Sequence, residues 1–160
     1  MDEATCDILG STAVIINDLK QKRTKDYTFD WDKALQSEGD SGIKLQYLHC
    51  RLWSLEQSCG VYVPNECHPE YITEPIIHDL ITELANFEQI LKMSKEEYEA
   101  CILVNYLFRL AHRVNRVFNQ LKVKGTNPDT AAQRLLVFNA SRLIIKKSLE
   151  ILGVKPLNQM

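Results

Sequence analysis

The residues with the most definite chemistry are Tyr47 and Arg51, which stand four positions apart. On a helix they would lie side by side, roughly 110° around from a stripe of leucines and therefore at the edge of solvent. Proteins hold unstacked bases against aromatic rings and guanidinium planes, and hydrogen-bond to the exposed base edges. The pair could therefore read single-stranded nucleic acid. The residues alone also allow a simpler role, in which the tyrosine shields the core and the arginine is solvated.

The charge of the chain is unevenly distributed. Residues 100–160 hold 10 Lys and Arg against 2 Asp and Glu, whereas residues 1–99 hold 9 against 19. This asymmetry favours a polyanionic partner, with charge complementarity inside the fold as the alternative. Phosphate contacts would add affinity without reading any base. We expect such contacts from basic residues of the last two predicted helices, which are Arg109, Arg113, Arg116, Lys122, Arg142, Lys146 and Lys147.

No set of residues predicts catalysis by this chain. The four histidines are scattered, and the chain has no H-E-x-x-H motif, nucleophile elbow or phosphate-binding glycine loop. His49 and His112 fall in amphipathic helices, where a hydrogen-bonded imidazole is expected. Residues 92–95 (KMSK) resemble a signature of class I aminoacyl-tRNA synthetases, but that chemistry needs a partner H-x-G-H motif, which is absent. We interpret Ser94 and Glu97 as a capping box at a helix start instead.

The cysteines and the apolar residues exclude several other classes. The five cysteines are odd in number and form no C-x-x-C motif, which favours free thiols in a reducing compartment. Cys59, Cys67, His68 and His78 match no usual metal-ligand spacing, so no metal is expected. No apolar run approaches the roughly 20 residues that a membrane-spanning helix needs. The first residues also lack the features of a targeting segment, so none is expected.

Apolar residues recur at helical spacing along the chain and show no period-2 alternation, which predicts an all-α bundle in one domain. Leu45, Leu48, Leu52 and Leu55 define the most regular helical stripe. Turn signals, caps and this periodicity together give the expected helices, which are 3–23, 32–37, 42–59, 75–91, a long helix from the Ser94 cap to about 121, and 129–152. Thr73 is expected to cap the helix at 75, and Gly153 to end the last one.

Several segments resemble arginyl-tRNA synthetases. Residues 25–32 (KDYTFDWD), 39–42 (GDSG) and 45–52 (LQYLHCRL) are similar to the family patterns FDWD, GDTG and LQYAHAR. Residues 131–142 and the C-terminal segment from Leu152-Gly153 to Met160 resemble the same family. The resemblance covers essentially the whole chain. It implies an all-α anticodon-binding domain of the DALR type over residues 1–160.

The resemblance further implies that the chain binds the anticodon arm of arginine tRNA. The tyrosine and arginine that contact the anticodon loop in the family fall on Tyr47 and Arg51, and its C-terminal methionine falls on Met160. Residues 1–25 would form the helix that joins a catalytic domain missing from this chain. The parent ligase would use ATP and arginine in that domain, so we expect no catalytic residue, cofactor or metal here.

Departures from the family pattern limit the expectations. Ile43-Lys44 stands where many members have Pro-Tyr, and Lys122 where some have an aromatic residue, so no base stacking is expected from either place. Residues 51–56 (RLWSLE) are similar to the animal mitochondrial branch, which predicts the mitochondrial matrix rather than the cytoplasm. Two alternatives remain: a free-standing helical adaptor that binds a protein or tRNA without catalysis, and an independent enzyme.

Overall fold

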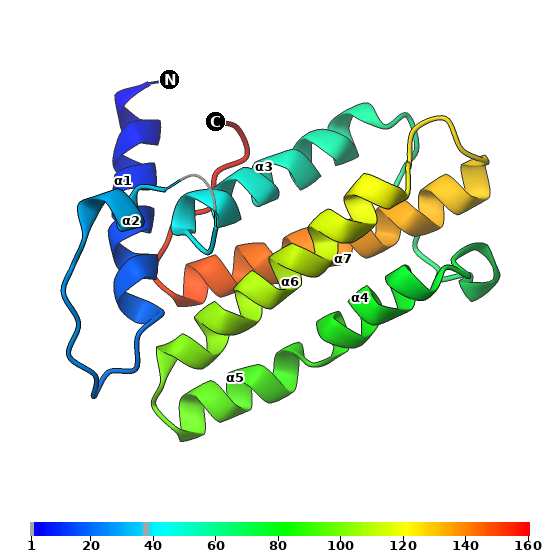
Figure 1. Cartoon of the computed structure of the whole chain (residues 1–160). Helices are drawn as coiled ribbons and strands as arrows, with labels where there is room; N and C mark the ends of the chain where they lie inside the picture. Colours follow the sequence, from blue (N-terminus) through cyan, green and yellow to red (C-terminus); the bar gives the residue numbers. More distant parts are fainter. Residues whose placement is uncertain (1, 37–38) are drawn as a thin grey trace.

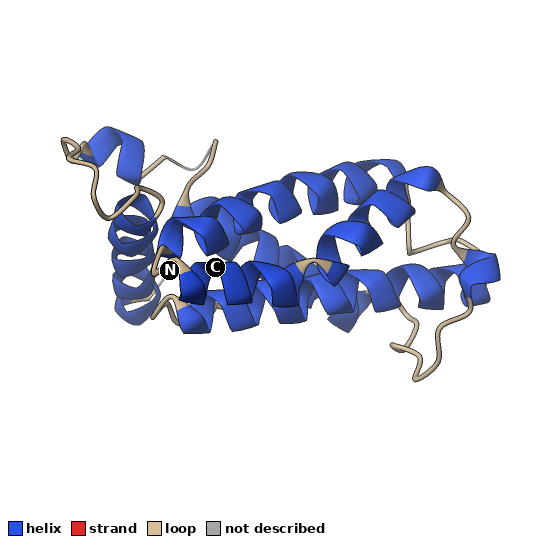
Figure 2. Ribbon diagram, turned by 90° about the horizontal axis from the view of Figure 1, so that it is seen from below, coloured by secondary structure: helices blue, strands red, loops and turns tan. Residues whose placement is uncertain are grey.

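The computed structural model describes residues 2–36 and 39–160, and every regular element within these ranges is a helix (Figures 1 and 2). The predicted all-α class is therefore confirmed. Two short elements, α2 (Trp31–Ala34) and the 3-10 turn η1 (Pro69–Tyr71), interrupt the connecting loops. The longer helices are α1 (Glu3–Leu19), α3 (Gly42–Ser58), α4 (Pro75–Ala85), α5 (Phe87–Glu96), α6 (Ala100–Gln120) and α7 (Pro128–Ile151).

Helices α3, α6 and α7 run alongside one another, and α4 and α5 follow α6 on its other side (Figure 1). Helix α1 crosses one end of this bundle and packs mainly on α3, so it is seen nearly end-on in Figure 2. The main core lies between these helices and contains the largest fully buried side chains, which include Tyr106, Phe138, Leu45, Leu48, Leu52, Leu107 and Leu135. Tyr47 and Ser54 of α3 remain exposed to solvent.

The sequence of α3 explains both of its faces. Ser41 caps the helix because its hydroxyl accepts a hydrogen bond from the backbone N–H of Lys44 at 3.3 Å. The predicted leucine stripe is buried, with Leu55 at its partly buried end. Gly42 lies against α1, where a Cβ would come within 2.6 Å of the carbonyl oxygen of Thr12. A side chain at position 42 would therefore push α1 and α3 apart.

The end of α7 directs the last residues back toward α3. Asn127 caps the helix start by accepting from the backbone N–H of Asp129, and Pro128 occupies the first turn. Gly153 has a φ of 79°, so it ends the helix in the left-handed conformation that glycine adopts without strain, as predicted. Residues 153–160, which we call the C-terminal tail, then run beside the first half of α3 (Figure 1).

One predicted helix, 75–91, is wrong because the structure divides the segment into α4 and α5 at Asn86. Asparagine favours helix ends over helix interiors, and the break allows both α4 and α5 to pack on α6. Helical periodicity continues through the break, so it gave no sign of a boundary. Helix α4 starts after Glu74 without a side-chain cap, so the expected cap by Thr73 is also wrong.

The predicted capping box is a second correction. Ser94 lies inside α5, where its hydroxyl donates to the carbonyl of Glu99 at 2.9 Å. The chain turns at Tyr98, whose φ is 53°, and α6 begins at Ala100. Ser94 therefore stabilises the turn after α5 rather than the start of α6. Two bounds also differ, since the first helix stops at Leu19 and the short helix spans Trp31–Ala34; position 37 lies outside the described residues.

Candidate nucleic-acid interface

A groove on the solvent side of α3 brings together the three residues that the sequence singled out for base reading. Tyr47 and Arg51 form one wall, and Met160 reaches them from the C-terminal tail. Tyr47 is 53% exposed and Met160 is 47% exposed, so both present apolar surface to solvent. The groove has a volume of about 450 Å³ and is also lined by Cys50, Ser54 and Gln159. It is large enough for an unstacked base.

The guanidinium group of Arg51 lies close to two aromatic rings. Its central carbon lies 5.8 Å from the ring centre of Tyr47 on the same helix and 4.1 Å from that of Phe118 on α6. Cation–π attraction and stacking restrict the arginine to this position. The side-by-side arrangement of Tyr47 and Arg51 is thus confirmed. A flat, charged plane close to aromatic rings is a surface on which bases stack.

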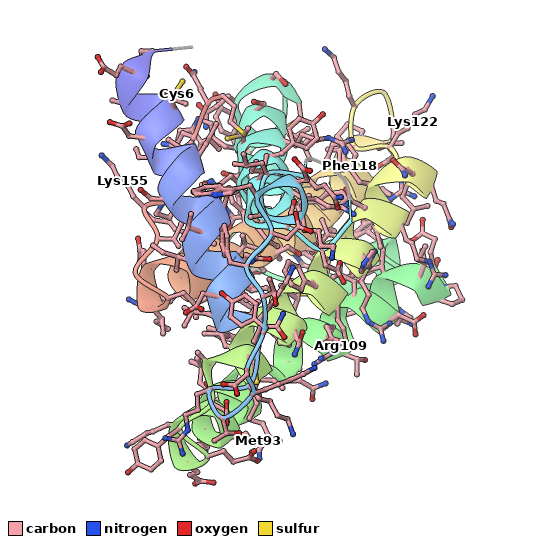
Figure 3. All side chains as sticks on the ribbon, turned by 60° about the vertical axis from the view of Figure 1, so that its left-hand side comes forward. Cys6, Met93, Arg109, Phe118, Lys122 and Lys155 are labelled. Atoms are coloured by element: carbon pink, nitrogen blue, oxygen red, sulfur yellow. The ribbon has the colours of Figure 1, made fainter. Side chains whose placement is uncertain are left out.

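A second, smaller cavity of about 200 Å³ is lined by Phe118. Its lining is mostly apolar, with Lys122 and Lys124 at the loop that follows α6. Figure 3 shows Phe118 and Lys122 at the same end of the molecule, away from Arg109. The backbone carbonyl of Lys122 accepts a hydrogen bond from Arg134 of α7 at 2.6 Å. This contact ties the loop of Lys122 and Lys124 to the bundle.

Buried side chains of α3 hold the C-terminal tail in place. The backbone N–H of Leu157 donates to Gln46 Oε1 at 2.9 Å, and its carbonyl is 2.6 Å from His49 Nδ1. Cys50 Sγ donates to the same carbonyl at 3.1 Å. Gln46 Nε2 also donates to the carbonyl of Lys155 at 2.9 Å. Both backbone groups of Leu157 are therefore bound by α3, three residues before Met160.

The titration of these groups follows from their burial. Burial lowers the pKa of His49, and the positive charges of Arg142 and Lys146 lower it further, while the hydrogen bond to Leu157 acts in the opposite direction. The ring is therefore neutral near pH 7, with its proton on Nδ1, the nitrogen that faces the carbonyl. Burial raises the pKa of the Cys50 thiol to about 11, which keeps it protonated and able to donate.

The structure places one of the predicted phosphate contacts, Arg142, inside the bundle. Its side chain is only 9% exposed and its Nε donates to Glu56 Oε1 at 2.7 Å, in an ion pair whose carboxylate is only 8% exposed. Its guanidinium carbon also lies 5.0 Å from the ring centre of Trp53. Arg142 therefore links α7 to α3 inside the bundle. The sequence could not show this because its partner, Glu56, stands 86 residues away.

Arg109 and Arg113 lie on a different surface from the groove. Both flank Glu83 of α4, with Nε to carboxylate oxygen distances of 3.5 Å for Arg109 and 2.9 Å for Arg113. Arg109 and Phe118 are about half a turn apart around α6, so the arginines face α4 while Phe118 faces α3. Two other predicted phosphate contacts lie elsewhere. Lys122 lines the second cavity. Lys146 is exposed, and its charge is near enough to lower the pKa of His49.

The remaining sequence expectations concern metals and membranes. Within residues 2–36 and 39–160, no three histidine, cysteine or acidic side chains are placed to hold a metal ion together. None of the described helices is both long and apolar enough to cross a membrane. KMSK residues 92–95 lie on α5, and Met93 is at the far end of the molecule from Phe118 (Figure 3).

Sequence reasoning missed three residues of this site, which are Phe118, Lys124 and the buried Gln46. Phe118 belongs to the apolar pattern of α6, so nothing in the sequence separates it from a core residue. Gln46 stands between two leucine-stripe positions and is fully buried, and a buried glutamine needs hydrogen-bond partners. The one usable signal was its position beside Tyr47 in the stretch that resembles LQYAHAR.

The helical bundle, with a groove that its C-terminal tail completes, is found here in a chain of the anticodon-binding domain class. The chain belongs to this class: the family described as the DALR anticodon binding domain matches residues 45–160. The match includes α3 from Leu45 onward, α4 to α7 and the C-terminal tail, and therefore every residue of the groove.

Proteins similar to the chain include cytoplasmic and mitochondrial arginine-tRNA ligases. The chain is 37% identical over 158 residues to the probable cytoplasmic arginine–tRNA ligase of Dictyostelium discoideum, covering 99% of this chain and 27% of that protein. It is 34% identical over 161 residues to the mitochondrial arginine–tRNA ligase of Saccharomyces cerevisiae, covering 99% and 25%. The chain thus spans about a quarter of these relatives.

Solved structures of arginyl-tRNA synthetases share the fold. The Thermus thermophilus enzyme superposes with a TM-score of 0.87 at 23% identity, over 96% of this chain and 27% of that one. The Plasmodium falciparum enzyme gives 0.85 at 24% identity, with the same coverage. The bundle is thus the fold of one part of these synthetases.

Proposed function

We propose that the chain binds the anticodon arm of arginine tRNA, as the anticodon-binding part of an arginine-tRNA ligase. The observation that carries the proposal is the convergence of Tyr47, Arg51 and Met160 on one groove, although Met160 is more than 100 residues away along the chain. Membership of the DALR family and the names of the relatives support the same partner.

The groove would act by stacking and by hydrogen bonding. An unstacked loop base would lie on the exposed ring of Tyr47, and Met160 would cover its edge. Arg51, already restricted by its contacts with Tyr47 and Phe118, would donate to a base edge without losing further side-chain freedom. Lys122, Lys124 and Lys146 would contact phosphates around the groove and add affinity without sequence preference.

Aminoacylation would belong to another part of the parent ligase. That part would use ATP and arginine, and α1 with the residues up to position 25 would lead from it into the bundle. This chain would then deliver the tRNA without carrying a catalytic residue or a cofactor of its own. Residues 92–95 lie on α5 and do not line the groove.

The test is equilibrium binding of arginine tRNA to the wild type, Tyr47→Ala and Tyr98→Ala across a salt series. Tyr98 is a matched control because it is 77% exposed and lies between α5 and α6, far from the groove. Loss of a stacked base costs about 1–3 kcal/mol, so Tyr47→Ala should bind roughly 5- to 150-fold more weakly. Tyr98→Ala should match the wild type. Equal affinities for all three proteins would refute base stacking by Tyr47.

We also propose a location in the mitochondrial matrix, on the resemblance of residues 51–56 to the animal mitochondrial branch. Relatives named for both compartments are similar to the chain, so their names do not decide between them. Imaging of the parent protein, tagged at its C-terminus, tests the location. A matrix signal supports the proposal, and a purely cytoplasmic signal contradicts it.

A further inference from the structure

We propose that Gln46 and His49, assisted by Cys50, are positioning residues that act on RNA through the C-terminal tail. They clamp the backbone of Leu157 and so hold Met160 on the groove beside Tyr47. The functional part of this inference rests on the proposed binding of tRNA. The clamp itself is a structural property that can be tested without RNA.

The clamp is complete at one residue of the tail. Gln46 accepts from the Leu157 N–H and His49 Nδ1 donates to its carbonyl, at 2.9 and 2.6 Å. Gln46 Nε2 also binds the carbonyl of Lys155 and the hydroxyl of Thr12 on α1, at 2.9 and 3.0 Å. Gln46 and His49 are both fully buried, so water cannot replace these bonds. Loss of either partner would leave a buried polar group unpaired.

The anchor lies close enough to Met160 to control its position. Three residues span at most about 11 Å when fully extended, so fixing Leu157 confines Met160 to the neighbourhood of the groove. Chain ends are mobile unless they are tied down, and Asn158, Gln159 and Met160 are all exposed. The contacts with α3 therefore order the tail before any ligand binds, so binding does not carry the entropic cost of ordering it.

The arrangement assigns two different roles to neighbouring residues of one helix. Tyr47 and Arg51 point to solvent and line the groove, while Gln46 and His49 point inward to the tail. His49 Nε2 is buried and has no partner among the described residues, so the ring uses only Nδ1. This excludes a role for His49 as a direct base contact. Its effect on RNA must pass through Leu157 and Met160.

The first measurement is an NMR spectrum of the purified chain labelled with ¹³C at the methionine methyl groups. The chain has three methionines, so the Met160 signal is assigned with a Met160→Ala variant. We expect His49→Leu to shift and narrow this signal as the tail is released. His49→Asn keeps an N–H near the position of Nδ1 and should restore the wild-type signal. Ser141→Ala removes another fully buried polar group, whose hydrogen bond is to Val137 of its own helix, and should leave the signal unchanged.

The second measurement is a double-mutant cycle on affinity for arginine tRNA. Met160→Ala and His49→Leu should each weaken binding about tenfold, and the double variant should also lose about tenfold, because both remove the same contact. Losses that multiply to about a hundredfold would show that His49 acts independently of Met160 and would overturn the proposal. Unchanged Met160 signals in His49→Leu would overturn it as well.

Two further features keep the test decisive. If His49→Leu does not fold, Leu157→Pro is the second variant. It removes the backbone N–H that donates to Gln46 Oε1 while leaving α3 intact, and it should release Met160 in the same way. If the wild type binds no tRNA, the proposed function fails, but the methyl spectra still decide whether the clamp exists. Failure of the clamp with normal tRNA binding would leave the proposed function standing.

Discussion

The ion pair between Glu56 and Arg142 allows a sharp prediction because neither of its members lines the groove. Arg142→Met keeps much of the side-chain volume against Trp53 but removes the charge. It leaves the carboxylate of Glu56, which is only 8% exposed, with the amide of Asn139 as its remaining partner at 3.1 Å. The prediction concerns both the stability of the bundle and its affinity for RNA.

The expected cost follows from this burial. Removing one partner of a buried ion pair destabilises a protein by about 3–5 kcal/mol, because the other charge stays buried without compensation. Glu56 keeps the Asn139 bond, so we expect about 3 kcal/mol for Arg142→Met. Replacing both charges, in Glu56→Leu with Arg142→Met, should cost about 2 kcal/mol less than Arg142→Met alone, since no unpaired charge remains.

The assay is urea unfolding at pH 7, with the free energy of unfolding obtained by linear extrapolation. Lys92→Ala is the control, because it breaks the exposed pair of Lys92 and Glu88, whose side chains are 60% and 80% exposed. It should change stability by less than about 0.5 kcal/mol. The salt dependence of tRNA affinity is measured on the same proteins. Arg142→Met should leave the slope unchanged, whereas Lys122→Ala should reduce it by about 1.

Two results would show that the ion pair does not act in this way. A cost below about 1 kcal/mol for Arg142→Met would mean that the ion pair does not hold α3 to α7. A lower salt slope in Arg142→Met would mean that Arg142 leaves Glu56 and contacts phosphate, as the sequence first suggested.

Three further predictions concern individual residues. The lowered pKa of His49 means that the unfolded chain takes up a proton at this residue before the folded chain does as the pH falls. The contribution of His49 to the free energy of unfolding is therefore complete above about pH 6.5 and is lost as the pH falls below it. Between pH 7.5 and 5.5 the wild type should lose more stability than His49→Asn, and equal losses would contradict the lowered pKa. Gly42→Ala should destabilise the chain by about 1–3 kcal/mol because the new Cβ meets Thr12, whereas a Cβ at Gly10 has nothing within 4 Å, so Gly10→Ala should stabilise it by up to about 1 kcal/mol. Thermal melts of both variants measure these effects. Changes of the same sign would be evidence against the close packing of α1 on α3. The buried Cys50 thiol has a pKa raised to about 11, so at pH 8 it should react with a thiol reagent at least about tenfold more slowly than the exposed Cys6. Mass spectrometry follows both reactions. Similar rates would disprove the burial of Cys50.

Much of the fold could be predicted from the sequence because the bundle depends on periodicity, which is local. The leucine stripe of α3 and the glycine stop of α7 both follow from residues within a few turns of each other. The break at Asn86 could not be predicted from the sequence, because α4 and α5 present one continuous apolar pattern to α6. The Ser94 capping box failed because the same short pattern also fits the end of a helix.

The site was partly predictable for a related reason. Tyr47 and Arg51 are four residues apart, so helix geometry alone places them side by side. Their meeting with Met160 was expected only from the resemblance to the family, since no local rule joins residues so far apart. The role of Arg142 could not be predicted, because charge alone does not tell a buried ion pair from a phosphate contact. Burial and the position of Glu56 decide it, and both come from tertiary structure.

Anticodon reading by the groove can be measured by comparing the binding of two RNAs to the wild-type chain. One is arginine tRNA, and the other is the same tRNA with its anticodon exchanged for that of another amino acid. Both are titrated at several salt concentrations. We predict that the exchange weakens binding at least about tenfold at every salt concentration, since base contacts differ while the phosphates do not. Equal affinity for the two RNAs throughout the series would mean that the groove does not read the anticodon and that the chain offers only a phosphate-binding surface.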